Sequence, residues 1–269
     1  VGIARLGGTS GFIGRVGDDP FGALMQRTLL TEGVDITYLK QDEWHRTSTV
    51  LVDLNDQGER SFTFMVRPSA DLFLETTDLP CWRHGEWLHL CSIALSAEPS
   101  RTSAFTAMTA IRHAGGFVSF DPNIREDLWQ DEHLLRLCLR QALQLADVVK
   151  LSEEEWRLIS GKTQNDRDIC ALAKEYEIAM LLVTKGAEGV VVCYRGQVHH
   201  FAGMSVNCVD STGAGDAFVA GLLTGLSSTG LSTDEREMRR IIDLAQRCGA
   251  LAVTAKGAMT ALPCRQELE

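Results

Sequence analysis

The stretch Val-Asp-Ser-Thr-Gly-Ala-Gly-Asp-Ala-Phe at positions 209–218 organises the chain. It is typical of the end of an extended segment, a tight glycine turn and the start of a helix, because an apolar run follows from Ala217. Gly213 and Gly215 have no Cβ, so the backbone can turn sharply and a ligand can come close. The first N–H groups of a helix have no intrahelical partner and carry the positive end of its dipole, which predicts an anion site here.

Asp216 lies at the mouth of this predicted anion site, where a carboxylate is unexpected. Its presence is explained if it acts as a base on a hydroxyl while the backbone amides hold a phosphate. A dinucleotide-binding fingerprint would need a third glycine at the position of Phe218, and no Gly-Lys-Ser/Thr of a P-loop follows. A purely structural glycine turn is the remaining alternative.

The composition is ordinary for a globular protein of one large domain or two small ones: 269 residues, 45% hydrophobic and 23% charged. A net charge of −10 without a Lys/Arg run argues against a nucleic acid or a membrane as partner. No apolar stretch reaches transmembrane length. The eight cysteines are scattered without Cys-x-x-Cys spacing, which predicts a reducing cytoplasm rather than a disulfide scaffold or a zinc site.

Strand-like and helix-like segments alternate along most of the chain, which predicts an α/β fold with a mostly parallel sheet covered on both faces. We expect strands at 11–17, 87–91, 117–120, 147–151, 180–184, 190–194 and 197–201. We expect helices at 20–33, 99–113, 134–146, 153–160, 166–176, 215–226 and 234–252. Ligands of such sheets bind beyond the carboxyl ends of the strands.

One hairpin departs from the alternation. Residues 47–54 and 60–66 are strand-like, and Asn-Asp-Gln-Gly at 55–58 has the composition of a turn.

The stretch at 209–218 closely resembles the Asp-Thr-Thr-Gly-Ala-Gly-Asp signature of the ribokinase-like (PfkB) sugar kinase family, with Ser211 in place of the first Thr. The resemblance implies one kinase domain over 1–269, a Rossmann-like three-layer α/β/α sandwich with a small β lid at about 45–71. It also implies that Asp216 is the catalytic base and that the amides of Gly213, Ala214 and Gly215 form the anion hole. In the family, a first strand and a glycine segment precede the phrase at 1–8, so we expect the natural N-terminus to be missing.

Two further motifs resemble this family. Asp-Pro-Asn-Ile-Arg at 121–125 is similar to a phrase of its bacterial fructokinase-type members, which implies that Arg125 contacts a phosphate or the substrate. A plain turn with an exposed arginine is the competing interpretation. Lys-Leu-Ser-Glu-Glu-Glu at 150–155 is similar to the Asn-x-x-Glu motif, with Ser152 replacing the Asn, and implies that Glu155 orients water on Mg²⁺. The spacing from Ser152 to Glu155 is also that of a capping box.

The nucleotide side is implied by two segments. Val-Thr-Lys-Gly-Ala-Glu-Gly at 183–189 resembles the family's Thr-x-Gly-x-x-Gly segment, and residues 246–258 resemble its adenine-side helix and loop. The ATP-binding residues implied are Lys150, Thr184, Gly186, Gly189, Gln246 and Gly249. Asp210, with carbonyls of 257–261, is implied to hold a potassium-like cation.

The resemblance implies ATP-dependent phosphorylation of a primary hydroxyl of a sugar, with Mg²⁺ and, in many members, K⁺. Fructose giving fructose 6-phosphate is favoured over aminoimidazole riboside or 2-keto-3-deoxygluconate. A family member that has lost activity and acts as a regulatory or structural partner is a different class, and Phe218 disfavours a dinucleotide oxidoreductase. We also expect a homodimer through the β lid, because unpaired strand edges tend to be covered.

Overall fold

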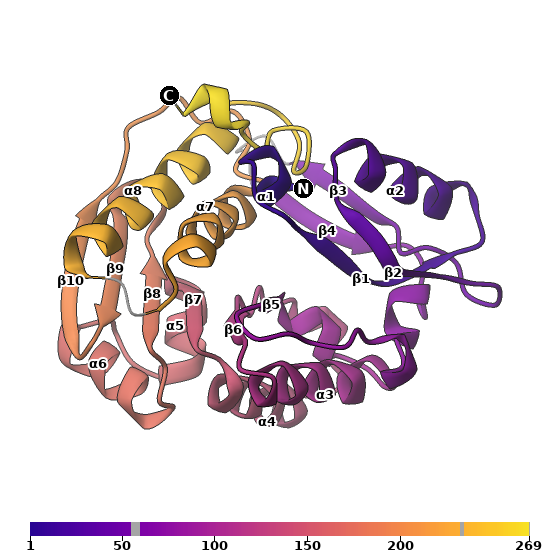
Figure 1. Cartoon of the computed structure of the whole chain (residues 1–269), viewed down its shortest axis with the longest axis horizontal. Coiled ribbons are helices and arrows are strands. Elements are labelled where there is room, and N and C mark those ends of the chain that lie inside the picture. The colour runs from indigo at the N-terminus through magenta and orange to yellow at the C-terminus, as the bar shows by residue number, and fades with distance from the viewer. Residues whose placement is uncertain (55–59, 232–233, 269) are drawn as a thin grey trace.

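The computed structural model describes residues 1–54, 60–231 and 234–268. Figure 1 shows a large body, in which helices surround a central sheet, and a smaller part built mainly from the N-terminal strands. The hairpin turn expected at 55–58 lies outside the described residues.

Six strands form the sheet of the body in the order β10-β9-β8-β7-β6-β5. The strands from β5 to β8 run parallel, and β9 and β10 add an antiparallel hairpin at the β8 edge. Their bounds are β5 Trp87–Leu90, β6 Phe117–Phe120, β7 Val148–Ser152, β8 Met180–Thr184, β9 Gly189–Tyr194 and β10 Gln197–Ala202. The prediction of a mostly parallel sheet is confirmed.

Helices cover both faces of this sheet. Successive side chains of β7 point to opposite faces and pack in two different cores. Val149 and Leu151 pack in the core with α3 to α6, whereas Val148 packs in a second core with α7 and α8. A strand buried on both faces is what a three-layer α/β/α sandwich requires, so the predicted fold class is confirmed. The helix bounds are α3 Ser100–His113, α4 Glu132–Leu145, α5 Glu153–Ser160, α6 Asp166–Glu175, α7 Ala214–Thr229 and α8 Glu235–Ala252.

The smaller part contains two separate two-stranded sheets. β1 (Gly11–Gly17) pairs in parallel with β2 (Asp35–Asp42), and α2 (Pro20–Thr31) connects them; β3 (Val50–Leu54) pairs antiparallel with β4 (Arg60–Phe64). The Asp19 side chain caps α2 by accepting from the backbone N–H of Gly22 at 2.9 Å, and Pro20 follows at the first helical position. The short helix α1 (Gly2–Arg5) precedes β1.

One strand was missed by the sequence expectations. β2 has charged and polar residues alternating with few apolar ones, and only Leu39 and Asp42 of its eight residues are buried. Residues 203–210, which lead from β10 to the glycine turn, belong to no strand. Short 3₁₀ helices fill other connections: η1 Ala70–Phe73, η2 Thr76–Asp78, η3 Ser92–Leu95, η4 Glu126–Leu128, η5 Gly186–Glu188 and η6 Arg265–Glu267.

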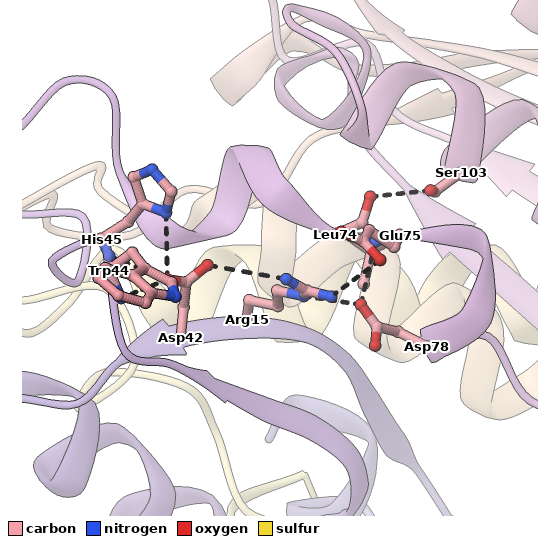
Figure 2. A network of polar contacts seen from close by, with 8 residues as sticks. All are labelled: Arg15, Asp42, Trp44, His45, Leu74, Glu75, Asp78 and Ser103. Atoms are coloured by element: carbon pink, nitrogen blue, oxygen red, sulfur yellow. Dashed lines mark hydrogen bonds and ion pairs between the residues drawn. The ribbon is translucent and has the colours of Figure 1, made fainter.

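A network of charged groups connects the smaller part to the body (Figure 2). Arg15 on β1 donates from Nε to Asp78 Oδ2 at 2.7 Å, and its terminal nitrogens lie 3.7 Å from carboxylate oxygens of Asp42 and of Glu75. Ser103 on α3 donates to a carbonyl of the same connecting segment at 2.8 Å. The segment between β4 and β5 is therefore held by Arg15 from one side and by the body from the other.

The part of the chain that the structure describes contains no helix with the length and apolar character needed to cross a membrane.

Candidate active site

A cavity of about 770 Å³ lies at the carboxyl ends of β6, β7 and β8, where these strands meet the first turn of α7. Its walls come from the segments 121–126, 150–158, 184–186 and 211–216. The cavity therefore occupies the edge of the sheet where parallel α/β proteins bind ligands.

The glycine turn forms one wall, and its two glycines are required by their surroundings. Gly213 has φ +80°, and a Cβ there would lie 3.1 Å from backbone atoms of Ala258. A Cβ on Gly215 would lie 2.9 Å from Nζ of Lys150. Gly213 therefore needs a residue without a side chain, whereas a Cβ at Gly215 would displace the ammonium group of Lys150. Gly213, Ala214 and Gly215 line the cavity at the start of α7, and the Ala214 N–H donates to the Ser211 carbonyl at 3.3 Å. The predicted anion site at this turn stays a prediction.

Asp210 stabilises this glycine turn through hydrogen bonds outside the cavity. Its Oδ1 accepts from the backbone N–H of Thr212 at 2.9 Å and from the Thr212 hydroxyl at 2.6 Å, and its Oδ2 accepts from the Gly257 N–H at 2.9 Å. Asp210 thus joins the glycine turn to the loop at 257–261 and does not line the cavity. Its predicted contact with a monovalent cation stays a prediction.

Asp216 lies in the first turn of α7 with its carboxylate in the cavity. The side chain is accessible to the solvent of the cavity, yet the walls surround it closely. This partial burial raises the pKa of Asp216, and the nearby Asp121 carboxylate raises it further, while Lys150 and Arg125 act in the opposite direction. A carboxylate with a raised pKa is a stronger base than an ordinary one.

Lys150 and Asp121 form a buried ion pair in the wall of the same cavity, with Nζ 2.8 Å from Oδ2. Burial alone would lower the pKa of Lys150, but the charge and the hydrogen bond of Asp121 raise it above its ordinary value. Lys150 therefore remains charged. Asp121 was expected only as part of a turn, without a functional role. Its position directly after a buried strand was the signal that could have marked it as a site residue.

Arg125 also lines the cavity, where its guanidinium donates to the Ile124 carbonyl at 2.9 Å. Its charge lowers the pKa of Asp216, so it is close enough to affect that carboxylate. The structure thus places Arg125 in the same cavity as Lys150 and Asp216. Its predicted contact with a phosphate or the substrate stays a prediction.

Glu155 lines the cavity from the first turn of α5, where it completes a capping box with Ser152. Its Oε2 accepts from the Ser152 N–H at 2.8 Å and its Oε1 from the Ile124 N–H at 3.0 Å. Burial and the nearby Asp121 raise the pKa of Glu155. The described residues contain no group of three or more His, Cys, Asp or Glu side chains that could hold a metal. One fixed carboxylate fits Mg²⁺ bound mainly through water and phosphate oxygens.

The predicted ATP-binding residues divide into two groups. Lys150, Thr184 and Gly186 line the cavity, and Thr184 donates from its hydroxyl to the Leu151 carbonyl at 3.2 Å. Gly189, Gln246 and Gly249 do not line it.

Two of the residues outside the cavity have contacts with the surrounding fold that account for their residue type. Gly189 has φ +106°, and a Cβ there would collide with the Phe201 carbonyl oxygen. Gln246 donates to the Ala202 carbonyl at 2.8 Å, which joins α8 to the end of β10. Their contacts with a nucleotide stay predictions.

The fold and this cavity are those of a carbohydrate kinase, and the chain belongs to the family described as pfkB family carbohydrate kinase, which matches residues 1–265. It is 60% identical over 269 residues to a fructokinase of Klebsiella pneumoniae, covering 100% of this chain and 88% of that protein. It is 50% identical over 268 residues to a fructokinase of Vibrio alginolyticus, covering 100% of this chain and 87% of that protein.

Solved structures give the same result. A fructokinase double mutant of Vibrio cholerae O395, in a form with fructose, ADP and potassium ion bound, superposes with a TM-score of 0.94 at 49% identity, covering 99% of this chain and 86% of that one. Aminoimidazole riboside kinase of Salmonella enterica, complexed with aminoimidazole riboside and an ATP analogue, superposes with a TM-score of 0.90 at 35% identity, with the same coverage. The resemblance inferred from sequence is therefore confirmed.

Proposed function

We propose that this protein phosphorylates D-fructose with ATP to give fructose 6-phosphate. The observation that carries the proposal is the meeting, in one cavity, of the Asp216 carboxylate with the glycine turn at 213–215, which begins α7. A base for a hydroxyl and a site for a phosphoryl group are the two elements that transfer to an alcohol needs. The high identity to fructokinases over the whole chain supports fructose as the acceptor.

In this mechanism, Asp216 accepts the proton of the primary hydroxyl as the sugar oxygen bonds to the γ-phosphorus and the bond to the leaving ADP oxygen breaks. The amides of Gly213, Ala214 and Gly215 donate to the oxygens of the transferring group, whose charge they stabilise in the transition state. Lys150 and Arg125 supply positive charge at the same wall. The raised pKa of Asp216 supports its role as the base.

The nucleotide would lie along the β8–β9 connection, with Thr184 and Gly186 in contact with it and Lys150 near its phosphates. Gly189, Gln246 and Gly249 would then form the backbone framework around the nucleotide. Glu155 would hold water on Mg²⁺, which when bound neutralises phosphate charge. The order that Asp210 imposes on the loop at 257–261 supports a K⁺ site there, as does the potassium ion named for the Vibrio cholerae relative.

Aminoimidazole riboside is the second candidate acceptor, because a kinase for that substrate is 38% identical over 266 residues. The test is ADP release with Mg·ATP and K⁺ across fructose, ribose, aminoimidazole riboside and 2-keto-3-deoxygluconate. Fructose should give the highest kcat/KM. Turnover on another sugar alone would change the substrate that we assign but not the mechanism. ATP binding without turnover on any sugar would favour a non-catalytic family member.

The β3–β4 hairpin supports a homodimer through the lid. Leu51 is 59% exposed, Met65 is 62% exposed, and Val50 and Val52 are also exposed. Within the described residues β3 and β4 pair only with each other, so each has an outer edge for another strand. Light scattering should give a dimer mass for the wild type and a monomer mass for Leu51→Lys, while a monomeric wild type would contradict the proposal.

The partners proposed are thus a sugar and ATP, without nucleic acid or membrane, in the cytoplasm. Eight free thiols and the net charge of −10 support this assignment. Cell fractionation tests it, and recovery with the membrane fraction would contradict it.

A further inference from the structure

Two cysteines lie against each other on the face of the sheet that α6 covers. Cys170 on α6 and Cys193 on β9 have their sulfur atoms 3.0 Å apart. Neither residue lines the cavity, and the proposed kinase activity uses neither of them. We propose that Cys170 and Cys193 are a redox modification site, at which the two thiols form a reversible disulfide that fastens α6 to the sheet.

The two thiols differ in access to solvent. Cys170 is half-buried, and its sulfur also lies 3.5 Å from the Gly196 carbonyl. Cys193 is 2% exposed, and burial together with Cys170 raises its pKa to about 12. An oxidant in solution therefore reaches Cys170 first, and Cys193 stays a protected thiol in contact with it.

Both sulfurs are held in place by elements that are fixed on several sides. Cys193 is paired with Leu181 of β8 and with Val198 of β10. α6 packs on the sheet through Ile169, a buried core residue next to Cys170. A disulfide bond of about 2.05 Å requires the two sulfurs, now 3.0 Å apart, to approach by about 1 Å.

The chemistry balances with a peroxide as the oxidant. The Cys170 thiolate attacks one oxygen of hydrogen peroxide, the O–O bond breaks, and the hydroxide that leaves takes up a proton to form water. This step leaves a sulfenic acid on Cys170. The sulfur of Cys193 then attacks that of Cys170, the S–O bond breaks, and the departing hydroxide takes the Cys193 proton as a second water. Two thiols are oxidised to a disulfide, and the two peroxide oxygens are reduced.

The disulfide would close the loop from 170 to 193, which contains β8 and the turn at 185–188. Thr184 and Gly186, two residues of the cavity wall, lie within this loop. The cross-link limits the unfolded chain more than the folded one, so it should stabilise this half of the body under oxidising conditions.

The test is a peptide map of the full chain after hydrogen peroxide treatment, digested with trypsin without reduction. Cleavage after Arg167, Lys174, Lys185 and Arg195 gives the peptides 168–174 and 186–195, each with a single cysteine. We expect these two peptides as one disulfide-linked species that dithiothreitol separates. The oxidised protein should also melt at least about 5 °C higher than the reduced protein.

Variants at the two sites make the test specific. Cys170→Ser should lose both the linked species and the rise in Tm, and Cys193→Ala provides the same check from the buried side. Cys208→Ser, which changes an exposed cysteine, should behave like the wild type. The proposal is overturned if Cys170 is found only as a sulfinic acid, if it is linked to another cysteine, or if both thiols remain free while the exposed cysteines oxidise.

Discussion

The Nζ atom of Lys150 lies 2.8 Å from Oδ2 of Asp121, and both side chains are buried beside the first turn of α7. The same Nζ reaches to 2.9 Å from the position that a Cβ on Gly215 would take. Asp121 therefore fixes a positive charge directly next to the proposed anion hole. The pair acts on Asp216 in opposite senses, since Lys150 lowers its pKa and Asp121 raises it.

Replacing the lysine should change the pH profile of turnover. In Lys150→Met the charge of Lys150 no longer lowers the pKa of Asp216, which therefore rises further above its ordinary value, although Arg125 still lowers it. Because the proposed base works in its ionised form, activity should be lost at a higher pH on the acidic side than in the wild type. We also expect kcat to fall by roughly 10²-fold, since a charge at the phosphoryl group is lost.

The measurement is kcat as a function of pH, from pH 5 to pH 9, for the wild type and for Lys150→Met. Lys162→Met is the matched control, because Lys162 pairs with Asp168 on the surface at 2.9 Å. An acidic limb at the same pH in Lys150→Met and in the wild type would contradict the assigned electrostatics.

The glycine turn allows a prediction with an internal control. Gly213→Ala puts a Cβ at φ +80° and 3.1 Å from the backbone of Ala258, so the amides of the turn must shift. Gly33→Ala introduces the same kind of backbone strain at φ +74°, but nothing lies within 4 Å of its Cβ. Both variants should lose about 1 kcal/mol of unfolding free energy.

Only Gly213→Ala should also lose turnover, by at least about 10²-fold, because displaced donors stabilise the transition state poorly. Urea denaturation and steady-state kinetics on both variants make the comparison. Full turnover in Gly213→Ala would show that the turn has a structural role alone.

Most of the fold could be predicted from the sequence, because the apolar runs of β5 to β9 and the capped helices between them have unambiguous periods. The capping box of Ser152 and Glu155 is where the sequence places it. β2 could not be predicted, because it is stabilised by pairing with β1, a contact that a pattern of mixed polar residues does not reveal.

The site was predicted where a residue belongs to a local motif. Asp216, Lys150 and Glu155 meet in the cavity as expected. The pairing of Asp121 with Lys150 could not be predicted, because the two residues are 29 positions apart in the sequence, although the place of Asp121 after a buried strand was a signal for the residue itself. Gln246 also donates to the Ala202 carbonyl, a contact that no linear pattern indicates, and its predicted contact with the nucleotide stays a prediction.

The ionised carboxylate of Asp216, which the proposed activity needs, should lower the stability of the folded protein. Its pKa in the folded protein lies above the ordinary value that applies in the unfolded chain. The folded state therefore binds the proton more tightly, and stability is lost as the pH rises from the ordinary carboxyl range through the raised pKa. Asp216→Asn removes this charge, so the variant should melt about 1–3 °C higher than the wild type at pH 8.

The difference in Tm should shrink as the pH falls, because the wild-type carboxyl takes up a proton as the pH approaches its raised pKa. Thermal denaturation of both proteins at pH 8 and pH 5 is the check. A variant that is less stable at pH 8 would show that the ionised carboxylate stabilises the fold.

The ion pairs of Arg15, which connect the smaller part to the body, should contribute to the stability of the fold. In Arg15→Met the buried carboxylates of Asp42 and Asp78 lose a charged partner (Figure 2). We expect a loss of about 1–3 kcal/mol of unfolding free energy, as for a partly buried donor removed from its acceptors.

Arg239→Met is the matched control, because Arg239 pairs with Glu235 on an exposed face of α8 and should contribute less than about 0.5 kcal/mol. Urea denaturation of both variants gives the two values. Equal losses would mean that the Arg15 network does not hold the two parts together.

The role of Asp216 as the base of a fructose-phosphorylating kinase can be checked by fructose-dependent ADP release of Asp216→Asn. Asp243→Asn, which changes an exposed carboxylate on α8 paired with Arg247, is the control. We expect wild-type turnover in the control and a loss of at least about 10²-fold in Asp216→Asn, with ATP still bound. Near-wild-type turnover in Asp216→Asn would show that another group accepts the proton.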